Sequence, residues 1–310
     1  MQPAPKLIAI SALVVMLATM PLFGSPFYTG LFTRIMVLGL AATSLNFILG
    51  YGGMVSLGHA AFIGIGAYAV GIPAYYDITN GWLHLLFAVL ASAAFALVTG
   101  AISLRTKGVH FIMITMAFAQ MAYFLFVSLE EYGGDDGLVI NSRSDFGMIG
   151  SLSRDVVLYY VAFFCLMATI VLMHRVVQSR FGMVIKGAKL NDRRMRAMGH
   201  HTYIHQLAAY VLSGIVAGIA GALLGNFTNF ISPAMMGWTR SGELIFMVIL
   251  GGAGTLFGPV VGAAVFLLLE QFLSGLWIYW HLIFGLFLIL VVLYARGGLD
   301  GVLRGKIGNG

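Results

Sequence analysis

Charged residues are scarce in this chain of 310 residues. Asp, Glu, Lys and Arg make up only 9% of the sequence, whereas hydrophobic residues make up 60%. Soluble domains carry about 25% charged residues, so this chain has too few charges to cover the surface of a soluble fold. It also has a single cysteine, Cys165. A lone cysteine excludes an internal disulfide, and its position within an apolar run favours a packing role.

Long apolar runs occupy most of the sequence. Most of them approach the roughly 20 residues that a helix needs to cross a bilayer. They lie at residues 7–23, 31–50, 54–76, 82–103, 109–128, 156–174, 204–225, 243–269 and 277–295. We therefore predict an all-α, polytopic integral membrane protein with about 8 to 10 transmembrane helices, some of them broken or re-entrant. The segments between the runs are short, which predicts a single transmembrane domain over residues 1–310.

The first run, residues 7–23, follows Lys6 as the core of a secretory signal would. No small-x-small cleavage site ends it before Pro21, and it is long for a signal core. We expect it to form the first transmembrane helix.

The distribution of Lys and Arg among the loops predicts the orientation. Residues 175–196 contain seven basic residues against one acidic residue, so we expect them to be cytoplasmic, as we expect for the turn at Arg105 and Lys107. Residues 129–155 contain six acidic residues against two basic ones, so we expect them outside. The basic C-terminal tail, and with it the N-terminus, should be cytoplasmic. Membrane orientation explains the net charge of +6 without a nucleic-acid partner.

A cytoplasmic tail requires an even number of crossings after the cytoplasmic segment, but only three apolar runs follow it. A break in run 243–269 restores the count, because glycines and Pro259 in its centre, GGAGTLFGP, interrupt a helix. We expect two arms, 243–251 and 259–272, both short for full spans. Irregular backbone at membrane depth is tolerated where protein buries it or where it lines an aqueous cavity. The break therefore indicates either a translocation route or close helix packing.

A second glycine-rich stretch surrounds His59. Residues 49–71 contain seven glycines, and Ser56 and His59 would share one helical face. A polar side chain at membrane depth often marks a substrate route, although a buried histidine that bonds a neighbouring carbonyl is the simpler explanation. Our hypothesis is that the turn at 50–58 interrupts the helix near the permeation route and that His59 holds this irregular backbone by hydrogen bonds.

Four stretches, in the same order, resemble the permease subunits of branched-chain amino acid ABC importers. They are NFILGYGGMVSLGHAAFIGIGAY at 46–68, GGDDGL at 133–138, and the longer segments 179–223 and 232–264. The resemblance implies a second homologous permease, two cytoplasmic ATPases and an external solute-binding protein as partners, within a lipid membrane. ATP would bind only to the partner ATPases, and we expect no cofactor in this chain. The sequence contains no GxxxxGK[ST] phosphate loop.

The resemblance and the glycine breaks together predict three groups of site residues, none of them catalytic or metal-binding. The suspected translocation route comprises Asn46, Gly52, Gly53, Ser56, Gly58, His59, Gly251, Gly252, Gly254 and Thr255. Coupling to the ATPases is expected in segment 175–203, at Phe181, Gly182, Lys186, Asn191, Asp192 and Gly199. The side that faces the binding protein is expected at Gly133, Gly134, Asp135, Asp136 and Gly137. Met183 and Gly187 depart from the family pattern, in which Arg and Ala are common.

We expect an importer of branched-chain or related apolar amino acids in the inner membrane of a bacterium. Urea, short amides and aromatic carboxylates remain alternative cargoes, because the external binding protein supplies much of the selectivity. A secondary transporter or channel is the alternative mechanism, since broken helices occur there too. An enzyme is not expected, because the adjacent Asp135 and Asp136 lie in an external loop and lack the histidine spacing of a metal site.

Overall fold

The computed structural model describes residues 19–21, 25–147, 150–276, 279, 282–287 and 289. Its elements are α2 (Pro26–Asn46), η1 (Phe47–Tyr51), α3 (His59–Tyr75), α4 (Gly81–Ser103), α5 (Val109–Val127), η2 (Glu130–Tyr132), β1 (Leu138–Val139), α6 (Asp155–Gln178), α7 (Arg180–Ala197), α8 (Thr202–Thr228), β2 (Phe230–Ile231), η4 (Pro233–Met236), α9 (Trp238–Gly251) and α10 (Gly258–Leu276). Most of the runs at 7–23 and 277–295 and both termini lie outside the described residues, so the predictions about them stand as predictions.

Six helices are long and apolar enough to cross a membrane: α2 with η1, α4, α5, α6, α8 and α10. A multi-pass helical membrane protein is therefore confirmed, while the larger number of spans that we predicted is not confirmed within the described residues. α3 and α9 are shorter, with 17 and 14 residues. One expectation was wrong: the second arm of the broken run is α10, whose 19 residues are not short for a span.

α8 lies at the centre of the bundle, in contact with α2, α3, α4, α6 and α7. Glycine allows its close approach to α3. A Cβ atom on Gly66 would collide with the Gly218 carbonyl, and one on Gly221 would collide with the Ile63 carbonyl. Small residues let helix backbones approach in this way inside membranes, where packing and not hydrophobicity drives association.

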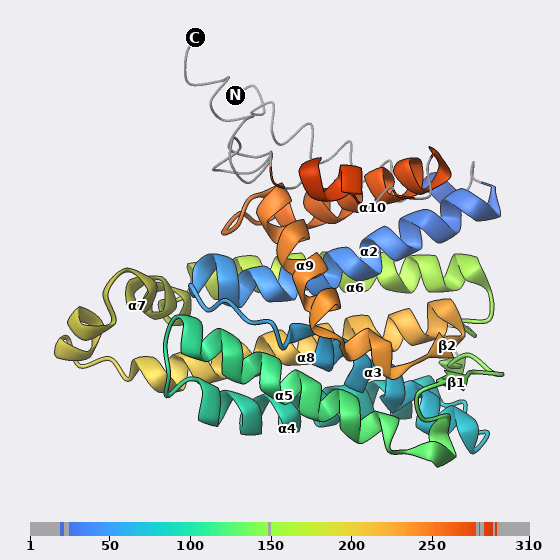
Figure 1. Cartoon of the computed structure of the whole chain (residues 1–310), viewed down its shortest axis with the longest axis horizontal. Coiled ribbons are helices and arrows are strands. Elements are labelled where there is room, and N and C mark those ends of the chain that lie inside the picture. The colour runs from blue at the N-terminus through green and yellow to red at the C-terminus, as the bar shows by residue number, and fades with distance from the viewer. Residues whose placement is uncertain are drawn as a thin grey trace, which may run out of the picture.

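The two ends of the bundle differ in their elements (Figure 1). One end, here called the α7 end, carries α7, and Lys107 of the α4–α5 turn pairs there with Asp192. The opposite end, the sheet end, carries the antiparallel pair β1–β2, which joins Leu138 to Ile231. The basic and acidic loops therefore lie at opposite ends, as the predicted orientation requires. Which end faces the cytoplasm stays a prediction from charge.

The run at 54–76 is not one continuous helix. α2 passes into the π-helix η1, and the chain then lacks helical structure until α3 begins at His59. Gly53 has a φ of +70°, and a Cβ atom on Gly58 would collide with the Thr115 carbonyl of α5. The predicted interruption at 50–58 is therefore confirmed. The prediction that Ser56 shares a helical face with His59 is wrong, because Ser56 precedes the helix.

The break in the run at 243–269 is also confirmed. α9 ends at Gly251 and α10 begins at Gly258. Between them, Gly252 and Gly254 have φ values of +110° and +81°, which a residue with a side chain rarely adopts. α9 begins at Trp238, earlier than the arm we predicted, and it lies across the direction of the long helices (Figure 1).

Candidate functional site

The two glycine-rich breaks meet at Asn46, the last residue of α2. Its Oδ1 accepts a hydrogen bond of 2.8 Å from the Gly254 N–H, and its Nδ2 donates one of 2.8 Å to the Thr255 carbonyl. Asn46 is only 2% exposed, and backbone groups away from water need such partners. One amide side chain thus holds the α9–α10 loop against the end of α2.

Close packing explains several of the glycines at this junction. A Cβ atom on Gly50 would collide with the Gly254 N–H, and one on Gly251 would collide with the Gly258 carbonyl. Thr255 closes the loop, because its Oγ1 donates to the Gly252 carbonyl at 2.8 Å and accepts from the Gly258 N–H at 3.1 Å. Of the two explanations for the break, close packing is visible in these contacts, and the role in translocation stays a prediction.

His59 is fully buried, and its partner lies on α2. Its Nε2 is 2.8 Å from the Ser44 hydroxyl, which itself donates to the Ala41 carbonyl at 2.7 Å. A hydroxyl has one hydrogen to donate, so in this arrangement His59 donates through Nε2. We expected His59 to bond the backbone at 50–58, and this was wrong, because its partner is the Ser44 hydroxyl. Ser56 does this instead, since its Oγ accepts from the Gly58 N–H at 3.2 Å.

The first turns of α3 and α9 meet inside the bundle. The Ala60 N–H donates to the buried Ser241 Oγ at 2.9 Å. Ser213, near the middle of α8, donates to the Ser44 carbonyl beside His59 at 2.5 Å. The start of α3 therefore lies inside the bundle, where the Ser241 side-chain oxygen satisfies one of the N–H groups that a helix start leaves free.

α7 is anchored to the bundle through its first turn. Phe181 stacks on His205 of α8, with 5.5 Å between ring centres. Gly182 lies against the end of α6, where a Cβ atom would collide with the carbonyls of Val176 and Val177. Both positions were predicted for coupling. The stacking on His205 uses the aromatic ring of Phe181, and the close contact with α6 leaves no room for a side chain at position 182.

The second half of α7 begins after a kink at Asn191. This residue has a φ of −157° and a ψ of 96°, and its Oδ1 accepts from the Arg194 N–H at 3.0 Å, which is the contact of an N-cap residue. Asp192 pairs with Lys107 and, at 2.7 Å, with Arg196. Burial alone would raise the pKa of the Asp192 carboxyl, but hydrogen bonds and these two cations outweigh it and lower the pKa. Gly199, with a φ of +86°, follows the helix.

Two lysines connect α7 to the first break. Lys189 Nζ donates to the Gly50 carbonyl at 2.6 Å, and the left-handed Gly53 leaves room for the Lys189 side chain. Lys186 Nζ lies 5.6 Å from the centre of the Tyr51 ring, within the range of a cation–π contact. A cavity of about 200 Å³ beside them is lined by residues that include Gly52 and Lys189. Sequence reasoning missed Lys189, whose only signal was its charge within a basic loop.

The glycines at 133–137 form a turn that is separate from this junction. Gly133, Gly134 and Gly137 all have positive φ, and a Cβ atom on Gly133 would collide with the Gly137 carbonyl. The Asp135 carboxylate accepts from the Tyr123 hydroxyl at 3.4 Å, and Asp136 is exposed. Both acidic side chains are therefore on the surface at the sheet end.

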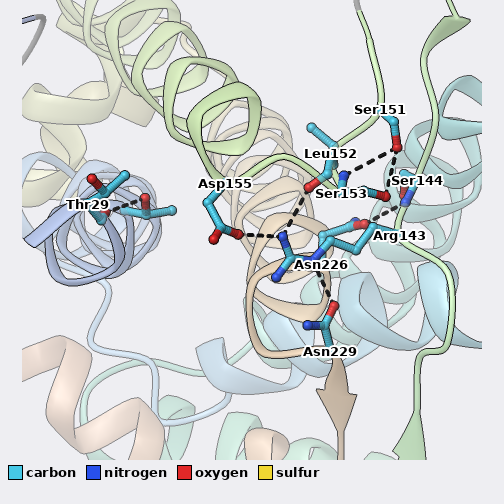
Figure 2. Close-up of polar contacts among 10 residues, drawn as sticks. Thr29, Arg143, Ser144, Ser151, Leu152, Ser153, Asp155, Asn226 and Asn229 are labelled. Carbon is cyan, nitrogen blue, oxygen red and sulfur yellow. Dashed lines mark hydrogen bonds and ion pairs between the residues drawn. The ribbon is translucent and has the colours of Figure 1, made fainter. Parts of the chain in front are cut away.

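A polar network that the sequence did not predict holds the rest of the α5–α6 loop. Figure 2 shows the Arg143 guanidinium between Asn229, Asp155 and Leu152. Arg143 donates to Asn229 Oδ1 at 2.7 Å, to Asp155 Oδ1 at 2.7 Å and to the Leu152 carbonyl at 3.1 Å. The neighbouring Ser144 N–H donates to Asn226 Oδ1 at 2.8 Å. The loop is thereby fastened to the end of α8.

Comparison with known proteins gives consistent matches along the chain. The family model described as branched-chain amino acid transport system / permease component matches residues 27–293. The high-affinity branched-chain amino acid transport system permease protein LivM of Salmonella typhimurium is 24% identical, over 96% of this chain and 76% of that protein. The high-affinity branched-chain amino acid transport system permease protein LivH of Escherichia coli is 23% identical, over 84% of this chain and 90% of that protein. The nucleoside ABC transporter permease protein NupC of Lactococcus lactis is 23% identical, over 64% of this chain and 72% of that protein.

Proposed function

Because this chain belongs to the permease family of branched-chain amino acid transport systems, we propose that it is the membrane-spanning subunit of an ATP-driven importer. Its cargo is branched-chain or related apolar amino acids, delivered by an external solute-binding protein. It works in the inner membrane of a bacterium, with cytoplasmic termini, beside a second homologous permease and two ATPases. It has no catalytic role of its own, because ATP hydrolysis belongs to the ATPases.

The observation that carries this proposal is the continuous contact from α7 to both breaks. Lys189 of α7 bonds the Gly50 carbonyl, and Asn46 joins the same end of α2 to Gly254 and Thr255. A displacement of α7 by an ATPase therefore reaches both interruptions of the helical bundle through hydrogen-bonded neighbours. A passive channel needs no such attachment between a peripheral helix and its route.

α7 and the residue after it also expose apolar side chains at the end of the bundle. Met183, Leu190 and Met198 are 58%, 87% and 59% exposed. Exposed apolar groups in a basic segment outside the membrane spans indicate a protein partner. Met183, which departs from the family pattern, fits such a surface. These residues support the docking of an ATPase on α7.

The relatives support two further parts of the proposal. The similarity to both LivM and LivH favours a second permease of the same fold as the partner in the membrane. The similarity to NupC makes nucleosides the competing cargo class, beside urea, amides and aromatic carboxylates. The comparison of cargoes therefore belongs in the first experiment.

Reconstitution of the complete transporter in proteoliposomes tests the function. We expect uptake of radiolabelled leucine, isoleucine or valine that requires internal ATP, both ATPases and the binding protein. An excess of uridine or urea should not compete. Uptake by this chain alone, without an ATPase, would contradict the importer mechanism, and uptake of uridine in preference to leucine would assign the alternative cargo.

A substitution on the α7 surface tests the docking. Leu190→Asp should abolish co-purification of the ATPases and ATP-driven uptake, because it places a charge in an apolar contact. Val156→Asp is the matched control, since Val156 is also exposed, at 48%, but lies at the start of α6 near the sheet end. Gly199→Trp should likewise abolish coupled uptake while membrane insertion persists. Retention of the ATPases by Leu190→Asp would move the docking surface elsewhere.

A further inference from the structure

A cavity of about 200 Å³ lies between α2, α3, α8 and α9, and none of the predicted site residues lines it. Thr228, the last residue of α8 before β2, places it toward the sheet end. Its charged lining consists of Arg34, Arg240 and Glu243. Its apolar lining is aliphatic or methionine, and includes Leu38, Ile63 and Leu244.

Two of the charged groups at and beside this cavity lie within helices long and apolar enough to cross a membrane. Arg34 is within the span of α2 and pairs with Glu270, within the span of α10, at 3.2 Å. Arg240 pairs with Glu243 at 2.8 Å, and both flank Ser241, which bonds the first turn of α3 inside the bundle. Ionisable groups within a bilayer are costly, and they face protein or a water-filled cavity in nearly every case.

The exposure of the pair on α9 shows which kind of surroundings it needs. The side chains of Arg240 and Glu243 are 53% and 36% exposed. Lipid would leave both charges poorly solvated, so this face of α9 meets water or protein. Within the described residues, each arginine uses one nitrogen in its ion pair. A guanidinium has five N–H donors, so both retain donors for an anionic group.

We propose that this cavity is a binding site for the zwitterion of an aliphatic α-amino acid on its passage through the protein. The substrate carboxylate is bound by Arg240 and Arg34, and its ammonium group by Glu243. This inference rests on the proposed function and assigns a substrate site to it. Bidentate arginine contacts suit a carboxylate, and Glu243 lies one helical turn after Arg240, so opposite charges are available side by side.

Charge and size both fit this ligand. With the substrate bound, Arg240 faces the carboxylate, Glu243 faces the ammonium group and Arg34 keeps Glu270, so every charge has a partner. The aliphatic wall accepts a branched side chain. The cavity is smaller than the roughly 300–1,000 Å³ of sites for drug-sized ligands, as a molecule of amino-acid size requires. A nucleoside offers no carboxylate to the arginines.

The test uses the complete reconstituted transporter with saturating binding protein. The readout is the amount of leucine imported per ATP hydrolysed, which does not depend on the fraction of folded protein. We expect Arg240→Gln and Glu243→Gln each to lower this ratio roughly tenfold or more, as the loss of a hydrogen bond to a charged group implies. ATP hydrolysis and co-purification of the partners should persist. Arg105→Gln, an exposed arginine in the α4–α5 turn, is the matched control.

A charge swap separates binding from structure. Arg240→Glu combined with Glu243→Arg keeps an ion pair on α9 but reverses its charges, so we expect the low ratio of the single variants. Recovery of the wild-type ratio would show a structural pair and overturn the site, as would unchanged ratios in the single variants. Loss of the second permease on purification would assign the pair to the interface between permeases and also overturn it. Failure of the wild-type transporter to import any branched-chain amino acid would instead overturn the proposed function.

Discussion

At the sheet end, the α5–α6 loop is held by three hydrogen bonds from the guanidinium of Arg143, whose side chain is 15% exposed. At the α7 end, Lys107 and Arg196 hold Asp192 with side chains that are 61% and 58% exposed. Buried polar networks fix one geometry, whereas exposed ion pairs contribute only about 0–1 kcal/mol each. The α5–α6 loop is thus fastened through a mostly buried guanidinium, whereas the two cations that hold Asp192 remain exposed.

The largest expected effect comes from breaking the buried network. Arg143→Gln leaves the half-buried Asn229 Oδ1 and the carbonyl of the buried Leu152 without their donor. An unsatisfied buried group costs about 1–3 kcal/mol. We expect the Tm of the purified protein to fall by a few degrees, since the shift is roughly 2–4 °C per kcal/mol for 150–250 residues and becomes smaller as the chain lengthens. Arg154→Gln, at an exposed arginine of the same loop, should leave the Tm unchanged. Equal Tm values for both variants would remove the contrast between the two ends.

Substitution of His59, in the middle of the bundle, should lower the Tm and ATP-driven uptake together. His59→Ala removes the donor to Ser44 Oγ at a fully buried position, at a cost of about 1–3 kcal/mol. His59→Gln keeps a donor and an acceptor and should largely restore both the Tm and ATP-driven uptake. If glutamine restores the Tm while uptake is lost as completely as with alanine, then His59 acts through its protonation and not through this hydrogen bond.

A smaller effect on stability, but a clear one on coupling, is expected at Lys189. Lys189→Met removes the bond to the Gly50 carbonyl while keeping most of the aliphatic stem that packs beside Gly53. The net loss should be only about 0.5–1.5 kcal/mol in unfolding free energy. Leucine uptake per ATP hydrolysed should fall severalfold, because α7 then moves without the end of α2. Lys189→Arg, which keeps a cation, should retain more coupling. An unchanged ratio of uptake to ATP hydrolysis in Lys189→Met would exclude coupling through the Lys189–Gly50 bond.

The smallest effect is expected at Asp192. Its pKa is lowered in the folded protein, so its contribution is fully present at neutral pH and is lost only as the pH falls below the usual value of about 3.9. At pH 7, Asp192→Asn should change the Tm little. A spin label at the exposed Arg193 should gain mobility in acid in the wild type, whereas the Asn variant should show that mobility already at neutral pH. Rigid labels in both would mean that other contacts hold α7.

The sequence predicted the parts of this fold that depend on composition over a window of residues. Apolar runs identified the spans, and glycines with Pro259 located the break between α9 and α10. The glycines at 50–58 likewise located the interruption before α3, which begins at His59. Only the contact of Gly58 with the Thr115 carbonyl of α5 shows why helix does not begin earlier.

The candidate sites were harder to predict, because their partners are far apart in the chain. Asn46 meets Gly254, and Arg34 meets Glu270, across more than two hundred positions in each case. The partners of each pair are too far apart in the sequence for a short motif to identify them. The roles of the predicted coupling and route residues stay predictions, while Arg34, Arg240 and Glu243 entered only through the cavity that they line.

The short helix α3 has a consequence for biogenesis. Its 17 residues begin inside the bundle, its first turn bonds Ser241, and Gly66 packs against Gly218 of α8. The ribosome produces both of those partners after α3. When α3 leaves the insertion machinery, the irregular backbone before it has no final partners to replace water. Residues 52–75 therefore cannot reach their final packing until α8 and α9 have been made. In a nascent chain stalled before α8, they remain unpacked and accessible to proteases and chaperones.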